Sequence, residues 1–144
     1  MKVVICGSIL FVEKIMEVEA GLRRRGHEVV VPYSIIKHGI KNSDDTMKMR
    51  NRPNFIRDEK PFFTRKHFDE IDGCDAILVV NVEKNGIPNY IGGATFAEMV
   101  FAFYKKKKIF LLNPIPDNQK LEFLRDEIEN TQPVILNGNL DMVK

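Results

Sequence analysis

The chain has few cysteines and none of the motifs of a disulfide-rich protein or of a protein stabilised by a structural metal. Its 144 residues include only two cysteines, Cys6 and Cys74, with no CxxC motif and no Cys/His cluster at zinc-ligand spacing. This scarcity argues against a disulfide framework and against a zinc-binding motif. Both cysteines lie in or beside apolar, strand-like segments, so we expect two buried thiols in a reducing compartment.

Charge and hydropathy argue against nucleic-acid-binding, membrane-bound and secreted proteins. The 22 Lys and Arg residues nearly balance the 20 Asp and Glu residues, and a net charge of +2 is too small to indicate binding to nucleic acid or to a membrane surface. No apolar run reaches the roughly 20 residues of a spanning helix. The opening MKVVIC starts a strand instead of a signal peptide. We therefore expect a cytoplasmic protein whose residues 1–144 form a single domain.

Short apolar segments alternate with helix-like segments along the chain. The strand-like segments are residues 2–8, 27–32, 75–81, 108–114 and 133–138, and helical patterns occupy 9–26, 64–74, 94–104 and 117–130. Such alternation is typical of parallel sheets covered by helices on both faces. It predicts a doubly wound α/β domain of flavodoxin-like or Rossmann-like type, with five parallel strands in the order 2-1-3-4-5.

Residues 33–66 do not follow this alternation. The segment is polar, carries both charges and is broken by Pro53 and Pro61, so we expect either a short helix within loops or a mobile lid. It should be the least ordered or the most ligand-dependent part of the chain. Within it, the basic residues of 47–66 form either a solvated face or a cationic lid over an anionic ligand.

The predicted sheet selects the place of a binding site. Ligands of such sheets bind at the carboxyl ends of the strands, where the strand order reverses between the first and third strands. Three parts of the chain should meet there. They are Gly7 and Ser8 after the first strand, Asn81 after the third, and the loop that contains Gly92, Gly93 and Thr95.

Glu98 is the single charge in the apolar helix predicted over residues 94–104. Two interpretations are open. Thr95 and Glu98 fit the capping box S/T-x-x-E, in which the glutamate bonds back to the helix start. Alternatively, the positive end of the helix keeps Glu98 ionised beside the crevice, as a nucleophile requires.

The other candidates also have structural alternatives. Ser8 could cap a helix instead of binding a phosphate. Asp75 opens the third strand at its amino end, where an ordinary turn residue is common. Asn81 is better placed than Asp75 for contact with a ligand, because it lies at the carboxyl end of the third strand. The three histidines, His27, His38 and His67, show no ligand spacing, and none is predicted to be catalytic.

Three segments resemble, in order, the nucleoside 2-deoxyribosyltransferase superfamily, which includes deoxynucleoside monophosphate N-glycosidases. They are VICGSI, FDEIDGCDAILVVN and GGATFAEMVFAF. GGATFAE is also similar to the PGGxGTxxE loop of the lysine-decarboxylase-like phosphoribohydrolases. Departures are Met99 and Val100 after the glutamate, where a glycine is usual, and residues 10–12, where the monophosphate hydrolases have Arg-Gly-Gly.

The resemblance implies cleavage or transfer at the N-glycosidic bond of a nucleoside or a nucleoside monophosphate, with no cofactor and no metal. Glu98 would be the nucleophile, and Asp75 is carried over as a second catalytic residue. The binding residues would be Gly7, Ser8, Asn81, Gly92, Gly93 and Thr95.

The resemblance also implies a homodimer or a higher homo-oligomer, which could cover the apolar helix around Phe96, Phe101 and Tyr104. The departures favour a rival class, a non-catalytic protein that binds a nucleotide or a partner on the same fold.

Overall fold

A computed structural model describes residues 1–144 and confirms the predicted sheet. Its five strands are all parallel and lie in the order β2-β1-β3-β4-β5. The strands are β1 (Lys2–Cys6), β2 (Glu28–Val30), β3 (Ala76–Val79), β4 (Lys108–Leu111) and β5 (Val134–Ile135). The chain reverses its direction of winding between β1 and β3, so the carboxyl ends of these two strands form the switch point.

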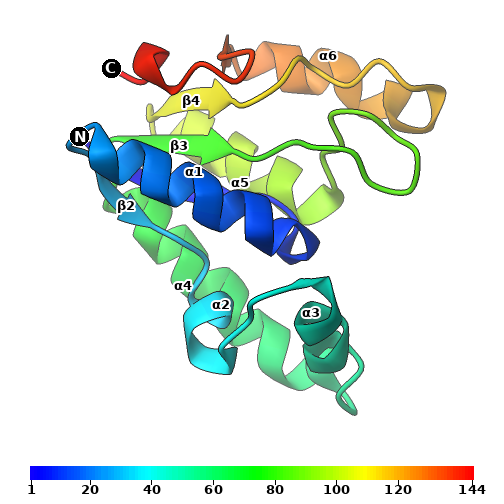
Figure 1. Cartoon of the computed structure of the whole chain (residues 1–144). Coiled ribbons are helices and arrows are strands. Elements are labelled where there is room, and N and C mark those ends of the chain that lie inside the picture. Colours follow the sequence, from blue (N-terminus) through cyan, green and yellow to red (C-terminus); the bar gives the residue numbers. More distant parts are fainter.

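Helices cover both faces of the sheet (Figure 1). The α-helices are α1 (Val12–Arg24), α2 (Tyr33–His38), α3 (Ser43–Arg50), α4 (Lys60–Asp72), α5 (Gly93–Tyr104) and α6 (Glu122–Asn130). Short helical turns are η1 (Ile9–Phe11), η2 (Phe55–Glu59), η3 (Gln119–Leu121) and η4 (Leu140–Met142). No helix is both long and apolar enough to cross a membrane.

Alternate residues of β1 pack into two separate cores, one on each face of the sheet. In β1, Val3 and Ile5 belong to the cluster that includes the apolar face of α1, whereas Val4 and Cys6 belong to the cluster that includes α5 and α6. This follows from the period of two along a strand, which sends successive side chains to opposite faces. Met99 of α5 is fully buried in the second cluster. The inward face of α5 therefore fixes that helix against the sheet, with its amino end at the switch point.

Residues 33–66 are far more helical than predicted. Instead of a short helix in loops, the chain forms α2, α3, η2 and the first part of α4, and these helices extend away from the sheet as a lobe (Figure 1). Local signals explain part of this: the Asn42 side chain caps α3 by accepting from Asp45 N, and Gly39 ends α2 in the left-handed conformation. Whether the lobe responds to a ligand stays a prediction.

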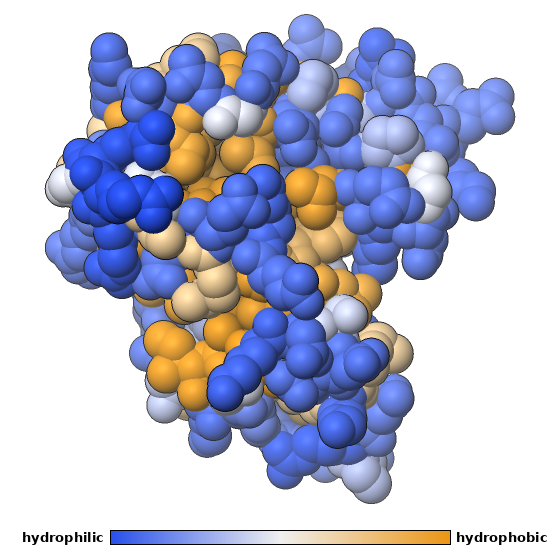
Figure 2. Space-filling model, viewed as in Figure 1, coloured by the Kyte–Doolittle hydropathy of each residue, from blue (hydrophilic) through white to orange (hydrophobic).

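Aromatic rings of the lobe pack against one another, and Phe55 and Phe63 also join the core on the α1 face of the sheet. The Phe63 ring lies 6.4 Å from that of Phe55, 6.2 Å from that of Tyr33 and 5.5 Å from that of Phe62, measured between ring centroids. Figure 2 shows hydrophobic surface on this lobe and in the recess between it and the sheet layer, on a face that is otherwise mostly hydrophilic. The lobe thus presents apolar side chains toward the switch point.

Candidate active site

A cavity of about 250 Å³ lies between the lobe and the carboxyl edge of the sheet. Its volume suits a small molecule and is near the lower end of ligand pockets, which hold about 300–1,000 Å³. The sheet side supplies the turn after β1 and the start of α5, and the lobe supplies residues of α2, α3 and α4. The switch-point rule therefore locates one wall of the cavity, and the unexpected helices form the other.

Glu98 projects from α5 into this cavity. The helix begins at Gly93 with Gly92 as N-cap, and no side chain caps it. The capping-box interpretation of Thr95 and Glu98 is therefore wrong, because both residues lie inside the helix. The Glu98 side chain is only 16% exposed, and its Oε2 atom is buried without a hydrogen-bond partner. An apolar helix holds this carboxylate for a reason other than capping.

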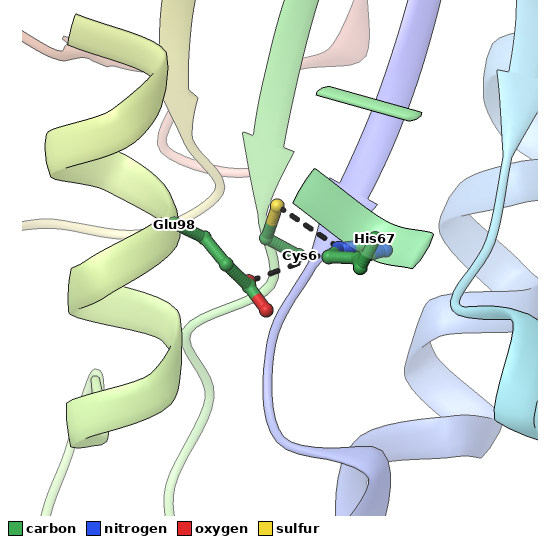
Figure 3. Close-up of side chains that lie close together, drawn as sticks. All are labelled: Cys6, His67 and Glu98. Carbon is green, nitrogen blue, oxygen red and sulfur yellow. Dashed lines mark hydrogen bonds and ion pairs between the residues drawn. The ribbon is translucent and has the colours of Figure 1, made fainter. Parts of the chain in front are cut away.

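The neighbours of Glu98 are Cys6, at the end of β1, and His67, on α4 (Figure 3). The three side chains point toward one another from three separate elements. His67 Nε2 lies 3.8 Å from Glu98 Oε2 and 3.5 Å from Cys6 Sγ. Behind the imidazole, Nδ1 of His67 lies 3.4 Å from Glu70 Oε2, one helical turn further along α4. The result is a buried row of carboxylate, imidazole and carboxylate, with a thiol beside it.

Burial and charge act against each other in this row. Burial raises the pKa of Glu98, and the opposing effects of His67, Cys6 and Lys60 offset this only in part. For His67, burial alone would lower the pKa, but Glu70 and Glu98 outweigh it and the pKa is raised. Burial, reinforced by Glu98, raises the pKa of the Cys6 thiol well above its ordinary value. Desolvation therefore works against the positive helix end, and the ionised state of Glu98 stays a prediction.

Most of the predicted binding residues come together. The cavity is lined by Gly7, Ser8, Gly92, Gly93 and Thr95 in addition to Glu98. Ser8 also caps a helix, the alternative role that the sequence allowed: its hydroxyl accepts from Leu10 N at 3.3 Å at the start of η1. Gly7 allows β1 and β3 to approach closely, since a Cβ atom there would lie 2.9 Å from Val80 O.

Asn81 and Asp75 do not reach the cavity. The Asn81 amide is fully buried, donates to the carbonyls of Asn113 and Pro114 and accepts from Asn113 N, so it ties the end of β3 to the turn after β4. Asp75 precedes β3 at the opposite edge of the sheet, where it accepts from Lys2 N at 2.7 Å. The geometry thus corrects both predictions: Asn81 joins two strand ends, and Asp75 is a structural residue at the amino edge.

The sequence patterns missed Lys84 and the histidine of the cavity. Arg50 of α3, Lys60 of α4 and Lys84 of the loop after β3 all line the cavity, and Glu98 is the only acidic residue that does. Burial, followed by Arg50, lowers the pKa of Lys84. Arg50 and Lys60 belong to the basic run of residues 47–66, for which a cationic lid was one of the two predicted alternatives. For His67, the available signal was Glu70 one turn later on the same helix.

The predicted exposed aromatic face is partly covered within the chain. The Phe101 ring of α5 stacks on Phe68 of α4, with 4.7 Å between centroids, whereas Tyr104 is 78% exposed. A homo-oligomer stays a prediction.

No protein-family model and no curated protein sequence matches the chain. Among solved structures, the chain is similar to the 2-deoxyribosyltransferase of Bacillus psychrosaccharolyticus, with a TM-score of 0.54, 16% identity, and coverage of 77% of this chain and 71% of that one. It is also similar to the CMP N-glycosidase BcmB of Clostridium botulinum, with a TM-score of 0.46, 18% identity and coverage of 95% and 90%. The first similarity shows that the two proteins share a fold.

Proposed function

We propose that the protein cleaves or transfers at the N-glycosidic bond of a nucleoside 5′-monophosphate, with Glu98 as nucleophile. The observation that carries the proposal is the position of Glu98, the only carboxylate in a cavity lined by two glycine-containing turns and by three basic side chains. The shared fold with a 2-deoxyribosyltransferase supports the reaction class by analogy.

In the first step, a carboxylate oxygen of Glu98 bonds to C1′ of the sugar while the C1′–N bond breaks. The base leaves with the bonding electrons and takes up a proton from solvent. In the second step, water or an acceptor base attacks C1′ and gives up a proton to solvent, while the bond between C1′ and Glu98 breaks and releases the carboxylate, as in retaining glycosidases. His67, 3.8 Å from Glu98, would orient the carboxylate and stabilise its charge before the attack.

The basic residues of the cavity favour a phosphorylated substrate. Arg50, Lys60 and Lys84 surround one cavity that holds a single acidic side chain, so the cavity is electropositive away from Glu98. The amino end of α5, with Gly92 as N-cap and Gly93 as first residue, also presents backbone N–H groups to this space. A neutral nucleoside would leave these cations without a partner.

The test is base release from a panel of nucleosides and nucleoside monophosphates, followed by chromatography. We expect release from a monophosphate, and we expect Glu98→Gln to bind nucleotide yet lose several orders of magnitude in rate, because an amide is a far poorer nucleophile. Asp72→Asn is the matched control, since this carboxylate is exposed and pairs with Lys105 away from the cavity. A Glu98→Gln protein as active as the parent would contradict covalent catalysis.

Substrate choice can be tested separately. Lys84→Gln should weaken binding of the monophosphate more than that of the matching nucleoside, and the difference should shrink at high salt. If Lys84→Gln weakens binding of the monophosphate and of the nucleoside equally, Lys84 does not contact the phosphate.

One observation favours a second candidate, a protein that binds nucleotides without chemistry. Burial raises the pKa of Glu98 and so disfavours the ionised form that must attack C1′. If every substrate in the panel stays intact while a monophosphate still binds with dependence on Lys84, the cavity is a binding site and not an active site.

A further inference from the structure

We propose that Cys6, His67 and Glu98 form a binding site for one Zn²⁺ ion, with an open coordination position toward the cavity. This inference goes beyond the proposed function, which requires no metal. It rests on a cluster that the chain assembles from β1, α4 and α5, and on the donor atoms that meet there. Thiolate sulfur, imidazole nitrogen and carboxylate oxygen are the three protein ligand types of zinc.

The donor atoms already have nearly the spacing of a zinc centre. Tetrahedral geometry, with Zn–S of about 2.3 Å and Zn–N or Zn–O of about 2.0–2.2 Å, places ligand atoms about 3.4–3.6 Å apart. Cys6 Sγ and His67 Nε2 are separated by 3.5 Å, and His67 Nε2 and Glu98 Oε2 by 3.8 Å. All three donor atoms lie within 4.8 Å of one another. On binding, the carboxylate of Glu98 and the sulfur of Cys6 would approach to about 3.6 Å, the separation that tetrahedral coordination requires.

The surroundings of His67 are those of a metal ligand. A ligating imidazole usually donates its second N–H to a carboxylate, which fixes the ring and raises its basicity. In this chain Nδ1 faces Glu70 Oε2 at 3.4 Å, and Glu70 is itself held by Lys66 at 3.4 Å. The ring therefore directs Nε2 toward Cys6 and Glu98, and Glu70 lies close enough for a small shift to form the outer-sphere hydrogen bond that neither atom makes in this structure.

The cluster can be reached from the cavity. His67 and Glu98 line the cavity and Cys6 lies fully buried behind them, so an entering ion meets His67 and Glu98 first and Cys6 behind them. Glu98 Oε2, which is buried without a hydrogen-bond partner, would instead coordinate the ion. On binding, the thiol of Cys6 releases its proton to solvent and the ion takes its place on sulfur. Three protein ligands leave a fourth position for water or substrate, as in catalytic zinc sites.

Binding would also control the proposed reaction, a consequence that rests on the proposed function. An ion held by Glu98 occupies the carboxylate that must attack C1′. Zn²⁺ should therefore inhibit base release, and a chelator should restore it.

Cobalt spectroscopy tests the site without any substrate. Protein freed of metal by a chelator is titrated with Co²⁺, which gives a thiolate-to-cobalt charge-transfer band in the near ultraviolet and tetrahedral bands in the visible. We expect one equivalent to bind and Zn²⁺ to abolish both signals. Cys6→Ser should lose the charge-transfer band, whereas the matched control Cys74→Ser should keep it, because Cys74 Sγ donates to Ile71 O away from the cluster.

Two further variants keep both cysteines, so the site can still be tested if Cys6→Ser misfolds. Circular dichroism checks the folding of every variant. Glu70→Gln should weaken Co²⁺ binding by about 10–100-fold, the effect of losing a carboxylate behind a ligating histidine. His67→Gln should weaken it further. Absence of the charge-transfer band in the parent, its loss in Cys74→Ser, or unchanged affinity in His67→Gln would each overturn the site. None of these outcomes depends on whether the protein releases a base.

Discussion

The Gly7→Ala substitution tests whether β1 and β3 approach as closely at the switch point as the structure requires. Gly7 has a φ of +151°, and a Cβ atom there would lie 2.9 Å from the carbonyl oxygen of Val80. The obstacle is backbone, and it cannot rotate away: Val80 N donates to Cys6 O at 2.8 Å in the β1–β3 ladder. An unfavourable φ costs about 1–3 kcal/mol and overpacking about as much again, so we expect a loss of about 2–6 kcal/mol in unfolding free energy.

Urea denaturation followed by far-ultraviolet circular dichroism measures this loss as a lower midpoint. Gly93→Ala is the matched control, because a Cβ atom at Gly93 meets nothing within 4 Å. Alanine is favoured over glycine inside a helix, so Gly93→Ala should leave stability unchanged or raise it by up to about 1 kcal/mol. The same methyl group would enter the cavity that Gly93 lines, and nucleotide binding should weaken.

The two glycines should therefore separate stability from binding. If Gly7→Ala unfolds at the parental midpoint, the close approach of the turn after β1 to Val80 is refuted. If Gly93→Ala binds nucleotide as the parent does, the start of α5 does not contact the ligand.

Three smaller predictions follow from other contacts. Asn81→Ala should cost about 1–3 kcal/mol, because it leaves the carbonyls beyond β4 without donors, and it should not alter ligand specificity, as paired denaturation and binding curves would reveal. Asp75→Asn should leave base release unchanged, since Asp75 lies at the amino edge of the sheet; a large rate loss would restore it as a catalytic candidate. The Lys105 ammonium, 2.9 Å away, lowers the pKa of Asp72, so this pair stabilises the fold above the unfolded pKa and the contribution disappears as pH falls through the folded pKa. Asp72→Asn should flatten the acid limb of a stability–pH profile, most visibly at low salt.

The sheet could be predicted because its signals are local and repeat along the chain. Continuous apolar residues in β3 and the alternation of strands with helices leave few arrangements for a domain of this length. The switch-point rule then placed Gly7 and Gly93 on one cavity without any knowledge of side-chain contacts. The same rule failed for Asn81, since the rule locates a strand end and does not say whether a side chain there turns to the ligand or to the neighbouring strand.

The lobe could not be predicted for a different reason. Its helices are short and polar, and they are stabilised by aromatic contacts such as Phe55 with Phe63, which depend on the tertiary fold. Short helices of this kind gain most of their stability from packing, so their sequence signal is weak. The role of His67 was hidden with them, because a single histidine shows its partners only when α4 is laid against β1 and α5.

The two walls of the cavity together explain why a carboxylate, Glu98, stands in an otherwise apolar helix. The sheet side supplies the backbone turns and Glu98, and the lobe side supplies His67 and the basic residues Arg50 and Lys60. A carboxylate at this depth is costly unless charged partners face it, and every basic group that lowers its pKa, His67 and Lys60, comes from the lobe. The lobe therefore acts on Glu98 in two opposing ways: by covering the cavity it helps to bury the carboxyl, which raises its pKa, and through His67 and Lys60 it supplies cations that offset part of this rise.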